Sequence, residues 1–279
     1  MEFLTQNEPT IRLAAFLSIF AVMALFEILL PRREPVRHEG RALKGRRWFS
    51  HGLLTIVNSL VLRLIFPAAA VGTALYASTN DIGLFNVIDV PWFVAAIVAF
   101  LVLDFAVWLE HWASHKIPLL WRIHQMHHAD TDLDVTTALR FHPLEIILSM
   151  VWKAAIVIAF GAPVAVVLIF EIVLNGMAMF NHSNAKLPLW LDRLVRLIFV
   201  TPDMHRVHHS IIQPETDSNY GFNFSFWDRL FKTYKAQPQG GHEAMQIGLE
   251  YYRDDKPSHL IWLLSLPFRH IPKTPTKKS

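Results

Sequence analysis

Residues 92–128 read WFVAAIVAFLVLDFAVWLEHWASHKIPLLWRIHQMHH, and this stretch contains the two features that decide the fold. From Trp92 to about Glu110 almost every side chain is apolar, and a helix of about 20 such residues spans the hydrocarbon core of a bilayer. The helix is expected to continue to Ile117, because Pro118 then forces a break. Histidines begin directly after the apolar run, so the stretch predicts a membrane helix that presents imidazole groups at one edge of the membrane.

The composition of the whole chain also points to a membrane protein. Of its 279 residues, 53% are apolar and 18% are charged, whereas soluble domains carry about 25% charged residues. This balance excludes a disordered chain and argues against a water-soluble globule. The chain has 11 glycines and no cysteine, which disfavours a turn-rich all-β fold. The lack of cysteine also excludes a disulfide framework, a thiolate zinc finger and a cysteine-ligated iron–sulfur cluster.

Four further apolar stretches lie at 11–30, 52–77, 144–160 and 163–181. Together with 92–110 they predict an all-α, polytopic membrane protein with four to five membrane helices and a cytoplasmic, histidine-rich helical cap. Only Gly161 and Ala162 separate the last two stretches, so these should pair as an antiparallel hairpin. We expect three regions: membrane helices in 1–100, a histidine-rich domain in 101–235, and a basic interfacial tail in 236–279.

The distribution of basic residues predicts the orientation in the membrane. The segment 31–47 holds seven Lys and Arg residues, whereas the connection 78–91 holds none. Loops rich in Lys and Arg stay in the cytoplasm, so every histidine-rich loop should return to that side of the cell membrane. The net charge of +3 then reflects membrane topology, and nucleic acid is not an expected partner. Lys153 lies inside an apolar stretch and is expected to reach the interface or to pair with a carboxylate such as Glu171.

Three histidine motifs occur: His111-x3-His115, His124-x2-His127-His128 and His205-x2-His208-His209. Spacings of three and four place side chains on one face of a helix, and imidazole is the commonest metal ligand in proteins. One such pair arises often by chance, but three motifs on one predicted side of the membrane indicate a metal site. Eight or nine histidines exceed the four ligands of a structural zinc ion. A nearly all-nitrogen ligand set of this size favours two metal ions, with iron as the first candidate.

These motifs resemble the three histidine boxes of the fatty acid hydroxylase/sterol desaturase superfamily of membrane di-iron oxygenases. Further matches are TTALRFHP at 136–143, the pair Asn181-His182, Asn219-Tyr220-Gly221, and WDRLFKTY at 227–234. The resemblance extends over about 104–234. It departs from the pattern at Lys232, where many relatives have Gly, and in the shorter spacer of the first motif.

The resemblance implies a centre of two iron ions that uses O2 and two external electrons to hydroxylate or desaturate a C–H bond of a lipid. Its metal ligands would be His111, His115, His124, His127, His128, His205, His208 and His209, with His182 as an additional ligand. No side chain is assigned a catalytic role of its own, because the chemistry is expected at the metals. Zinc could replace iron in purified protein, since it competes well for nitrogen sites.

Two residues outside the motifs are candidates for orienting a ligand ring. His142 precedes Pro143 at a helix start and could bind a metal or hold a ligand, and we favour the second role. Asp104 lies on the same helical face as His111 and could accept a hydrogen bond from a ligand. The acids at 130, 132 and 134 are interpreted as a solvated loop. The isolated histidines are interpreted as surface or interfacial residues, namely His38, His51, His242, His259 and His270.

Two segments near the third motif should lie at the membrane surface. The stretch 189–200 alternates apolar residues with charged ones and predicts an amphipathic helix on the membrane. Trp227, Phe231 and Tyr234 are typical of an interfacial aromatic belt.

The expected partners follow from what the sequence contains. The chain has neither a glycine-rich dinucleotide motif nor a cysteine, so electrons would come from a separate donor, a ferredoxin or a b-type cytochrome with its reductase. The substrate would be a fatty acyl, sterol or isoprenoid lipid drawn from the bilayer. Its identity, the carbon attacked, and the choice between hydroxylation and desaturation are left open by the motifs.

Two other functions compete with the oxygenase interpretation. A membrane zinc hydrolase would use the metal to activate water, but the sequence lacks the H-E-x-x-H motif. A non-catalytic metal-binding or transport protein would place ligands near the membrane midplane on broken helices, whereas these histidines lie at predicted helix ends. Metal content and O2 consumption distinguish the three.

Overall fold

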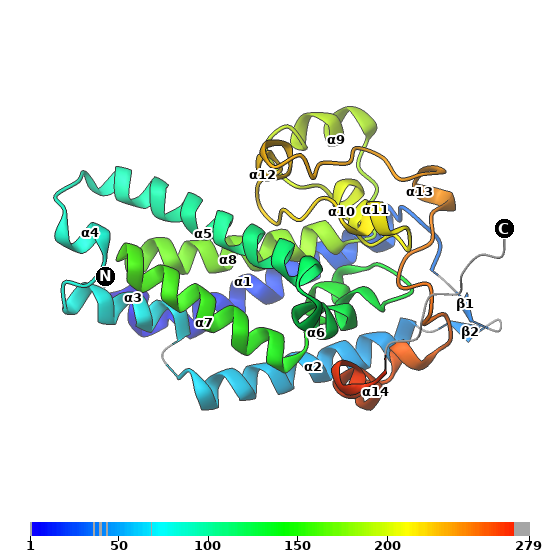
Figure 1. The fold of residues 1–279 in the computed structure, drawn as a ribbon, viewed down its shortest axis with the longest axis horizontal. Coiled ribbons are helices and arrows are strands. Elements are labelled where there is room, and N and C mark those ends of the chain that lie inside the picture. Colours follow the sequence, from blue (N-terminus) through cyan, green and yellow to red (C-terminus); the bar gives the residue numbers. More distant parts are fainter. Residues whose placement is uncertain (1, 36, 39–40, 43, 68, 271–279) are drawn as a thin grey trace.

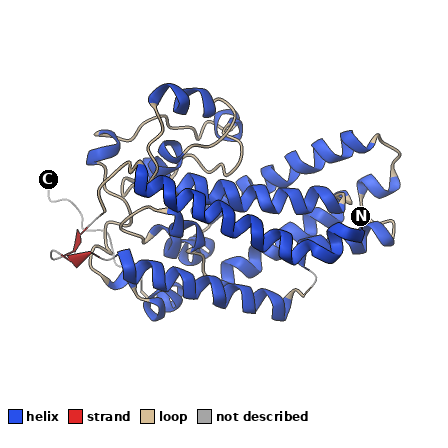
Figure 2. Ribbon diagram, turned by 180° about the vertical axis from the view of Figure 1, so that it is seen from behind, coloured by secondary structure: helices blue, strands red, loops and turns tan. Residues whose placement is uncertain are grey.

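The computed structural model describes residues 2–35, 37–38, 41–42, 44–67 and 69–270. Within them the protein is helical apart from one antiparallel pair of short strands, β1 (Arg37–His38) and β2 (Arg41–Ala42). Long helices run side by side along the longest axis, and most short helices gather at one end of this bundle (Figure 1). Figure 2 shows from behind that most loops also lie at that end. The predicted all-α architecture is confirmed.

The bundle consists of α1 (Glu2–Leu29), α2 (Lys44–Ile65), α3 (Ala69–Thr79), α5 (Trp92–Lys116), α7 (Pro143–Phe160) and α8 (Val164–His182). Among the described residues, five segments are long and apolar enough to cross a membrane, namely Asn7–Leu29, Lys44–Val87, Trp92–Lys116, Pro143–Phe160 and Val164–His182. The predicted polytopic membrane protein is therefore confirmed. The exposed side chains on these helices are largely apolar, as expected for residues that face lipid.

The second membrane segment differs from the single helix expected at 52–77. It consists of α2 and α3, which the break around Pro67 separates, followed by the short α4 (Leu84–Val87). Proline lacks the backbone N–H that would continue the helical hydrogen bonds, and its ring clashes with the preceding turn. Together α2 and α3 still run along the length of the bundle (Figure 1).

The hairpin of α7 and α8 is tight, as the sequence predicts. Helix α7 ends at Phe160 and is capped by Gly161, which has a φ of +60°, a conformation that glycine adopts without strain. A Cβ atom at Gly83 would overlap the backbone of Gly161, so this glycine lets the 80–84 turn pack against the hairpin. Between the two helices, Lys153 Nζ lies 2.9 Å from Glu171 Oε1, which confirms the predicted pairing of an intramembrane charge.

The end of the bundle that carries the histidines is covered by α6 (Pro118–His128), η1 (Val135–Leu139), α9 (Leu189–Val195), α10 (Pro202–His208), α11 (Gln213–Thr216) and α12 (Phe226–Leu230). The C-terminal region adds α13 (Gly241–Ala244), η2 (Lys256–Ser258), α14 (Leu260–Ser265) and η3 (Leu266–Phe268). Leu263 and Leu266 pack in one apolar cluster with Leu54 of α2 and Met126 of α6. This part of the predicted interfacial tail is therefore packed against the cap.

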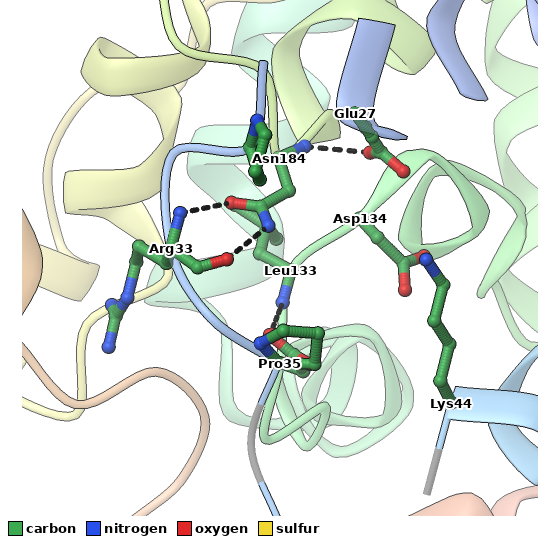
Figure 3. A pocket seen from close by; sticks show the side chains of 9 residues that line it. Glu27, Arg33, Pro35, Lys44, Leu133, Asp134 and Asn184 are labelled. Carbon is green, nitrogen blue, oxygen red and sulfur yellow. Dashed lines mark hydrogen bonds between the residues drawn. The ribbon is translucent and has the colours of Figure 1, made fainter. Parts of the chain in front are cut away.

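The last turn of α1 is attached to the end of α8. Glu27 Oε1 accepts hydrogen bonds from the backbone N–H groups of Val135, at 2.6 Å, and Asn184, at 2.7 Å. The Asn184 side chain in turn exchanges two hydrogen bonds with the backbone of Arg33, beside a small pocket of about 50 Å³ (Figure 3). These contacts hold the end of α8, and with it His182, against the loop that follows the second histidine motif.

Candidate metal centre

The structure brings all nine histidines that the sequence predicts as ligands into two adjacent groups. The first group contains His111, His115, His124, His128 and His208, and the second contains His127, His182, His205 and His209. Within each group, one ring nitrogen per residue lies within 4.8 Å of all the others. All nine side chains are buried, including that of His115 at 1% exposure. Each group could hold one metal ion.

Helical spacing explains how the motifs divide between the groups. Residues i and i+4 of a helix differ by about 40° around its axis, whereas residues i+3 and i+4 point about 100° apart. His124 and His128 of α6 therefore face the first group, and His127 faces the second. The third motif is arranged the other way, because its outer pair joins the second group and His208 joins the first. The two groups thus share both H-x2-H-H motifs.

Backbone carbonyl groups fix the orientation of several rings. The Nδ1 atoms of His111, His182 and His208 lie 2.7, 2.7 and 2.6 Å from the carbonyl oxygens of Tyr220, Ala178 and Ser218 respectively. A carbonyl oxygen can only accept a hydrogen bond, so each of these rings carries its proton on Nδ1. The Nε2 lone pair then points into the histidine cluster, as it does in metal sites whose outer nitrogen is held by a carbonyl.

One contact in the second group fits a metal ion better than a hydrogen bond. The Nε2 atoms of His127 and His182 are 3.0 Å apart. The Nδ1 atom of His127 lies 3.3 Å from the carbonyl oxygen of Arg140, so both rings are protonated at Nδ1 and two lone pairs face each other. Two nitrogens bound at about 2.1 Å to one ion, at a right angle, stand about 3.0 Å apart. A cation between the rings would resolve this contact.

Many ring nitrogens of the cluster have no hydrogen-bond partner among the described residues. They include Nε2 of His111, His124 and His208 and both ring nitrogens of His128 and His209. Buried polar atoms without partners are rare and costly. Burial and the neighbouring imidazoles lower the pKa of His127, His128, His205 and His209, and burial lowers that of His208 to about 3. The rings are therefore neutral, which is the form that binds metals.

A carboxylate that the sequence analysis missed contacts the cluster. Glu145 Oε1 accepts a hydrogen bond from His124 Nδ1 at 2.5 Å, which leaves Nε2 of His124 directed inward. Glu145 lies in the first turn of α7. The only feature of the sequence that could have indicated this contact is that Glu145 follows His142 by three residues. That feature is weak evidence, because acidic residues are common in the first turn of any helix.

The two residues expected to orient ligands have other partners. His142 caps α7: its Nδ1 accepts from the Leu144 N–H, and its Nε2 lies 3.1 Å from the Leu264 carbonyl oxygen. Asp104 Oδ2 accepts a hydrogen bond from Trp227 Nε1 at 2.8 Å. His142 therefore holds the start of α7 and the C-terminal segment, and Asp104 holds the segment after the third motif. Neither arrangement is a contact with a cluster histidine.

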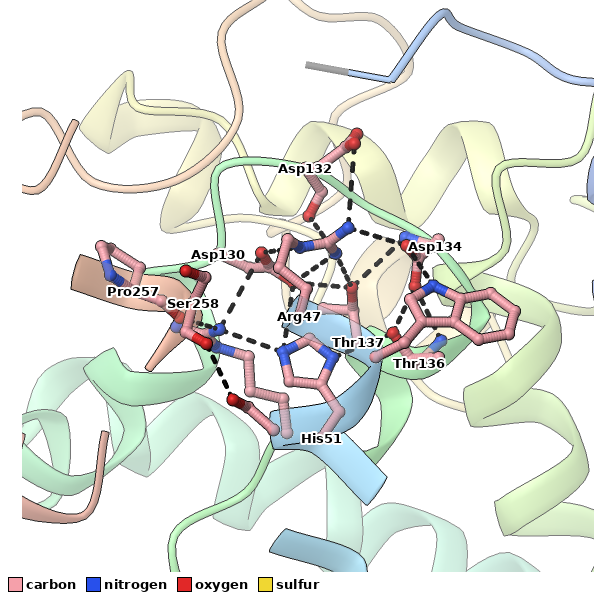
Figure 4. A network of polar contacts seen from close by, with 12 residues as sticks. Arg47, His51, Asp130, Asp132, Asp134, Thr136, Thr137, Pro257 and Ser258 are labelled. Atoms are coloured by element: carbon pink, nitrogen blue, oxygen red, sulfur yellow. Dashed lines mark hydrogen bonds and ion pairs between the residues drawn. The ribbon is translucent and has the colours of Figure 1, made fainter. Parts of the chain in front are cut away.

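The acidic loop after the second motif is buried, so its interpretation as a solvated loop is wrong. Arg47 donates to Asp130 at 2.7 Å and to Asp134 at 2.8 Å (Figure 4). Burial disfavours the charge on Asp130, but Arg47 and Arg140 outweigh it and hold the pKa of Asp130 far below its usual value. The sequence gives no sign of this network, because Arg47 lies in the predicted basic segment far from the acids in the chain.

His51 and Arg140 extend this network toward the metal cluster. His51 was expected at the surface, but it is fully buried and accepts from Arg140 Nη1 at 3.1 Å (Figure 4). Arg140 Nε also donates to the Met126 carbonyl at 2.7 Å, and its own carbonyl accepts from His127. The network therefore contacts the second histidine motif through the Met126 carbonyl and the His127 ring and helps to hold both in place.

The other isolated histidines fall into three cases. His242 is also buried, and burial lowers its pKa to about 4. His259 and His270 are exposed, as predicted. The side chain of His38 lies outside the described residues.

An apolar groove of about 320 Å³ lies between α5, α6 and α7, beside the first group. Its lining residues are Leu109, Glu110, Ala113, Ser114, Leu120, Ile123, Glu145, Leu148 and Trp152. Three of them, Glu110, Ser114 and Ile123, directly precede a histidine of the first group. A volume of this size suits a small-molecule ligand, and Glu145 joins the groove to the cluster through His124.

The fold and the cluster together define a helical membrane protein with a buried polyhistidine centre. Residues 96–233, which contain all nine histidines, match the family model described as fatty acid hydroxylase. This match, over nearly half of the chain, agrees with the family that the three histidine motifs resemble.

Several relatives of known name are similar to the chain. Ornithine lipid hydroxylase OlsE of Rhizobium tropici is 28% identical over 229 residues, which cover 80% of this chain and 67% of that protein. Human alkylglycerol monooxygenase is 30% identical over 258 residues, or 92% of this chain and 52% of that protein. A cholesterol 25-hydroxylase-like protein of Danio rerio is 25% identical over 228 residues, or 79% and 87%. The chain thus spans about half the length of the human relative. No solved structure matches.

Proposed function

We propose that the chain is an O2-dependent di-iron monooxygenase that hydroxylates a C–H bond in the alkyl or acyl chain of a membrane lipid. The observation that carries the proposal is the pair of buried histidine groups, in which many ring nitrogens, among them Nε2 of His111, His124 and His208, have no hydrogen-bond partner among the described residues. The family-model match and the relatives named as a lipid hydroxylase and an alkylglycerol monooxygenase support the reaction class. The reaction consumes one O2, two electrons and two protons, and yields the hydroxylated lipid and one water molecule.

The donor set supports iron as the metal. Nine imidazoles and no thiolate suit a first-row transition metal with positions left for other ligands. His111, His115, His124, His128 and His208 would hold one ion, and His127, His182, His205 and His209 the other. When bound, the two ions would supply the activation of O2 and the two-electron oxidation of the substrate. The electrons would come from a ferredoxin, or from a b-type cytochrome with its reductase.

The chain's own residues would bind and orient the substrate. Two walls of the groove, α5 and α7, are membrane-spanning segments, so an alkyl chain can enter it from the bilayer without crossing water. Leu109, Leu120 and Leu148 offer an apolar lining that stabilises a buried hydrocarbon by about 25 cal/mol per Å². Because Glu145 lines the groove and accepts a hydrogen bond from His124, an alkyl chain bound there would lie close to the first histidine group.

The orientation and the division of the chain complete the proposal. The basic segment 31–47 and the uncharged-to-acidic connection 78–91 support a cytoplasmic position for the centre. We assign the catalytic domain to 101–235, the preceding membrane helices to 1–100 and the remaining region to 236–279.

The test combines metal analysis with lipid analysis. Protein purified under reducing conditions with iron should contain two metal ions per chain, and a stoichiometry of one in fully loaded protein would contradict the dinuclear assignment. Cells that express the chain should contain a lipid heavier by one oxygen atom, formed only in the presence of O2. The matched control is His270→Ala, which changes an exposed histidine outside the cluster and should leave both results unchanged. A product formed without O2 by a zinc-loaded protein would instead favour the hydrolase alternative.

A further inference from the structure

Two short segments pack on each other, the second of them also on α5, and carry large apolar side chains that no other described residue covers. They comprise residues 189–199, with α9, and 224–232, with α12, and we call them the leaflet wedge. The exposed fractions are 65% for Leu189, 67% for Trp190, 58% for Leu194, 62% for Leu197, 54% for Ile198 and 65% for Leu230. A contiguous apolar surface of this kind marks an interaction site. In Figure 1, α9 and α12 lie together on one flank of the bundle.

The wedge is continuous with the membrane-facing surface of α5. Phe224, Trp227 and Phe231 of the wedge contact three aromatic residues of α5, with ring centroids 6.1 Å from Phe100, 5.0 Å from Phe105 and 4.5 Å from Trp108 respectively. All three positions on α5 lie inside the apolar span Trp92–Lys116. Phe100 and Trp108 are separated by about 12 Å along the helix axis. The wedge therefore packs along the apolar span itself and not only beyond its end.

The polar groups at this contact are paired with one another. Trp227 Nε1 donates to Asp104 at 2.8 Å, and Trp108 Nε1 donates to Asp228 at 3.1 Å. Each pair joins the wedge to α5, and each carboxylate accepts a hydrogen bond within the protein. Both carboxylates are buried, so neither is exposed on the surface that would face lipid.

The exposed charges of the wedge are cationic. Its two acidic residues, Asp192 and Asp228, are buried at 4% and 0% exposure, and Asp192 forms an ion pair with Arg196 at 2.5 Å. Arg193 and Lys232 are exposed. An apolar face with a cationic rim is the pattern of elements that insert into the interface of a membrane with anionic lipids.

We propose that the leaflet wedge inserts into the membrane leaflet on the side of the metal centre, alongside α5, with its cationic rim on anionic lipid headgroups. The amphipathic helix expected from the sequence is thus one part of a two-segment element that lies against a membrane helix. Between the two segments the chain carries the third histidine motif and the carbonyls of Ser218 and Tyr220, which orient His208 and His111. Insertion of the wedge therefore anchors one side of the metal centre to the bilayer.

The experiment measures how deep the wedge lies in the bilayer. Because the chain has no native cysteine, Leu194→Cys and Ile198→Cys provide unique attachment sites for a spin label in the full-length protein, reconstituted into vesicles of phosphatidylcholine with phosphatidylglycerol. The accessibility of each label to O2, which concentrates in lipid, is compared with its accessibility to a water-soluble nickel chelate. Val151→Cys on the membrane helix α7 is the lipid-exposed control, and Ala244→Cys on α13 is the aqueous control.

The labels at 194 and 198 should resemble the Val151 label, with high O2 and low nickel accessibility. In the reconstituted protein, a membrane-impermeant maleimide should not react with either unlabelled cysteine. Their depth should decrease when phosphatidylglycerol is omitted or when Arg193→Gln and Lys232→Gln are combined. Nickel accessibility equal to that of the Ala244 label would overturn the proposal. Protection from both reagents, with spin–spin coupling between chains, would overturn it in favour of contact with a second copy. Neither readout depends on enzymatic activity, so the result is independent of the proposed function.

Discussion

Replacing Glu145 by alanine should weaken the binding of one metal ion without unfolding the protein. Glu145 is the only carboxylate among the described residues that is within 3 Å of a histidine of the cluster, at 2.5 Å from His124 Nδ1. Its removal leaves the His124 ring free to turn and to protonate the wrong nitrogen. The first group, which also contains His111, His115, His128 and His208, should therefore lose affinity, while the second group should not.

The expected magnitude follows from the kind of contact. The loss of a hydrogen-bond partner on the outer nitrogen of a ligating histidine typically costs 10–100-fold in metal affinity or activity, which equals about 1.4–2.7 kcal/mol. Glu145→Gln should cost less than Glu145→Ala, because the amide oxygen can still accept from His124 Nδ1. A complete loss of the site is not expected, since four other imidazoles remain in the group.

The assay is a titration of metal-free protein with Fe2+ or Co2+ that resolves two binding steps. Glu110→Gln is the matched control, because Glu110 lines the same groove and accepts from Ser149 at 3.1 Å. It should leave both metal affinities unchanged, even if it alters the binding of a lipid in the groove. Unchanged metal affinity in Glu145→Ala would refute the argument that this carboxylate orients a ligand.

Three further expectations follow from the same geometry. His127→Ala and His208→Ala should each abolish turnover. His127→Ala should deplete the ion of the second histidine group, and His208→Ala that of the first group. Metal analysis together with the spectrum of a Co2+-substituted protein distinguishes the two variants. His142→Ala should lower the stability by about 0.5–2 kcal/mol through the loss of the α7 cap, measured by thermal unfolding in detergent, and should leave the metal content unchanged. An impermeant maleimide applied to intact cells should label Ser78→Cys and not Glu34→Cys, both of which are exposed positions; the reverse pattern would contradict a cytoplasmic metal centre.

The features that could be predicted from the sequence are those that depend on residues close to one another in the chain. Apolar runs of membrane length predict the helices, and spacings of three and four predict that His124, His127 and His128 share one end of a helix. The glycine at 161 predicts the tight hairpin. In each case the physical cause lies within a few residues of the feature, so one sequence is enough to detect it.

The features that could not be predicted depend on contacts between distant segments. Arg47 and Asp130 form a buried ion pair across 83 positions, and neither residue differs locally from a solvated one. Glu145 is 21 positions from His124, and only the packing of α7 on α6 joins them. The roles expected for Asp104 and His142 rested on helical phase and on a neighbouring proline, which do not specify the partner across the bundle.

The histidine motifs alone do not hold the cluster in shape, because the outer nitrogens of their rings are bound by other parts of the chain. The carbonyls of Tyr220 and Ser218 and the carboxylate of Glu145 each fix one ring of the first group. Two of these three groups belong to the connection between the segments of the leaflet wedge. Since a shift of 1 Å in a supporting group is enough to loosen a preorganised site, the position of the wedge on α5 should influence the geometry of the first group. The packing of Trp227 and Phe231 on α5 would therefore connect the segment that we propose to enter the leaflet with the carbonyls that orient His111 and His208.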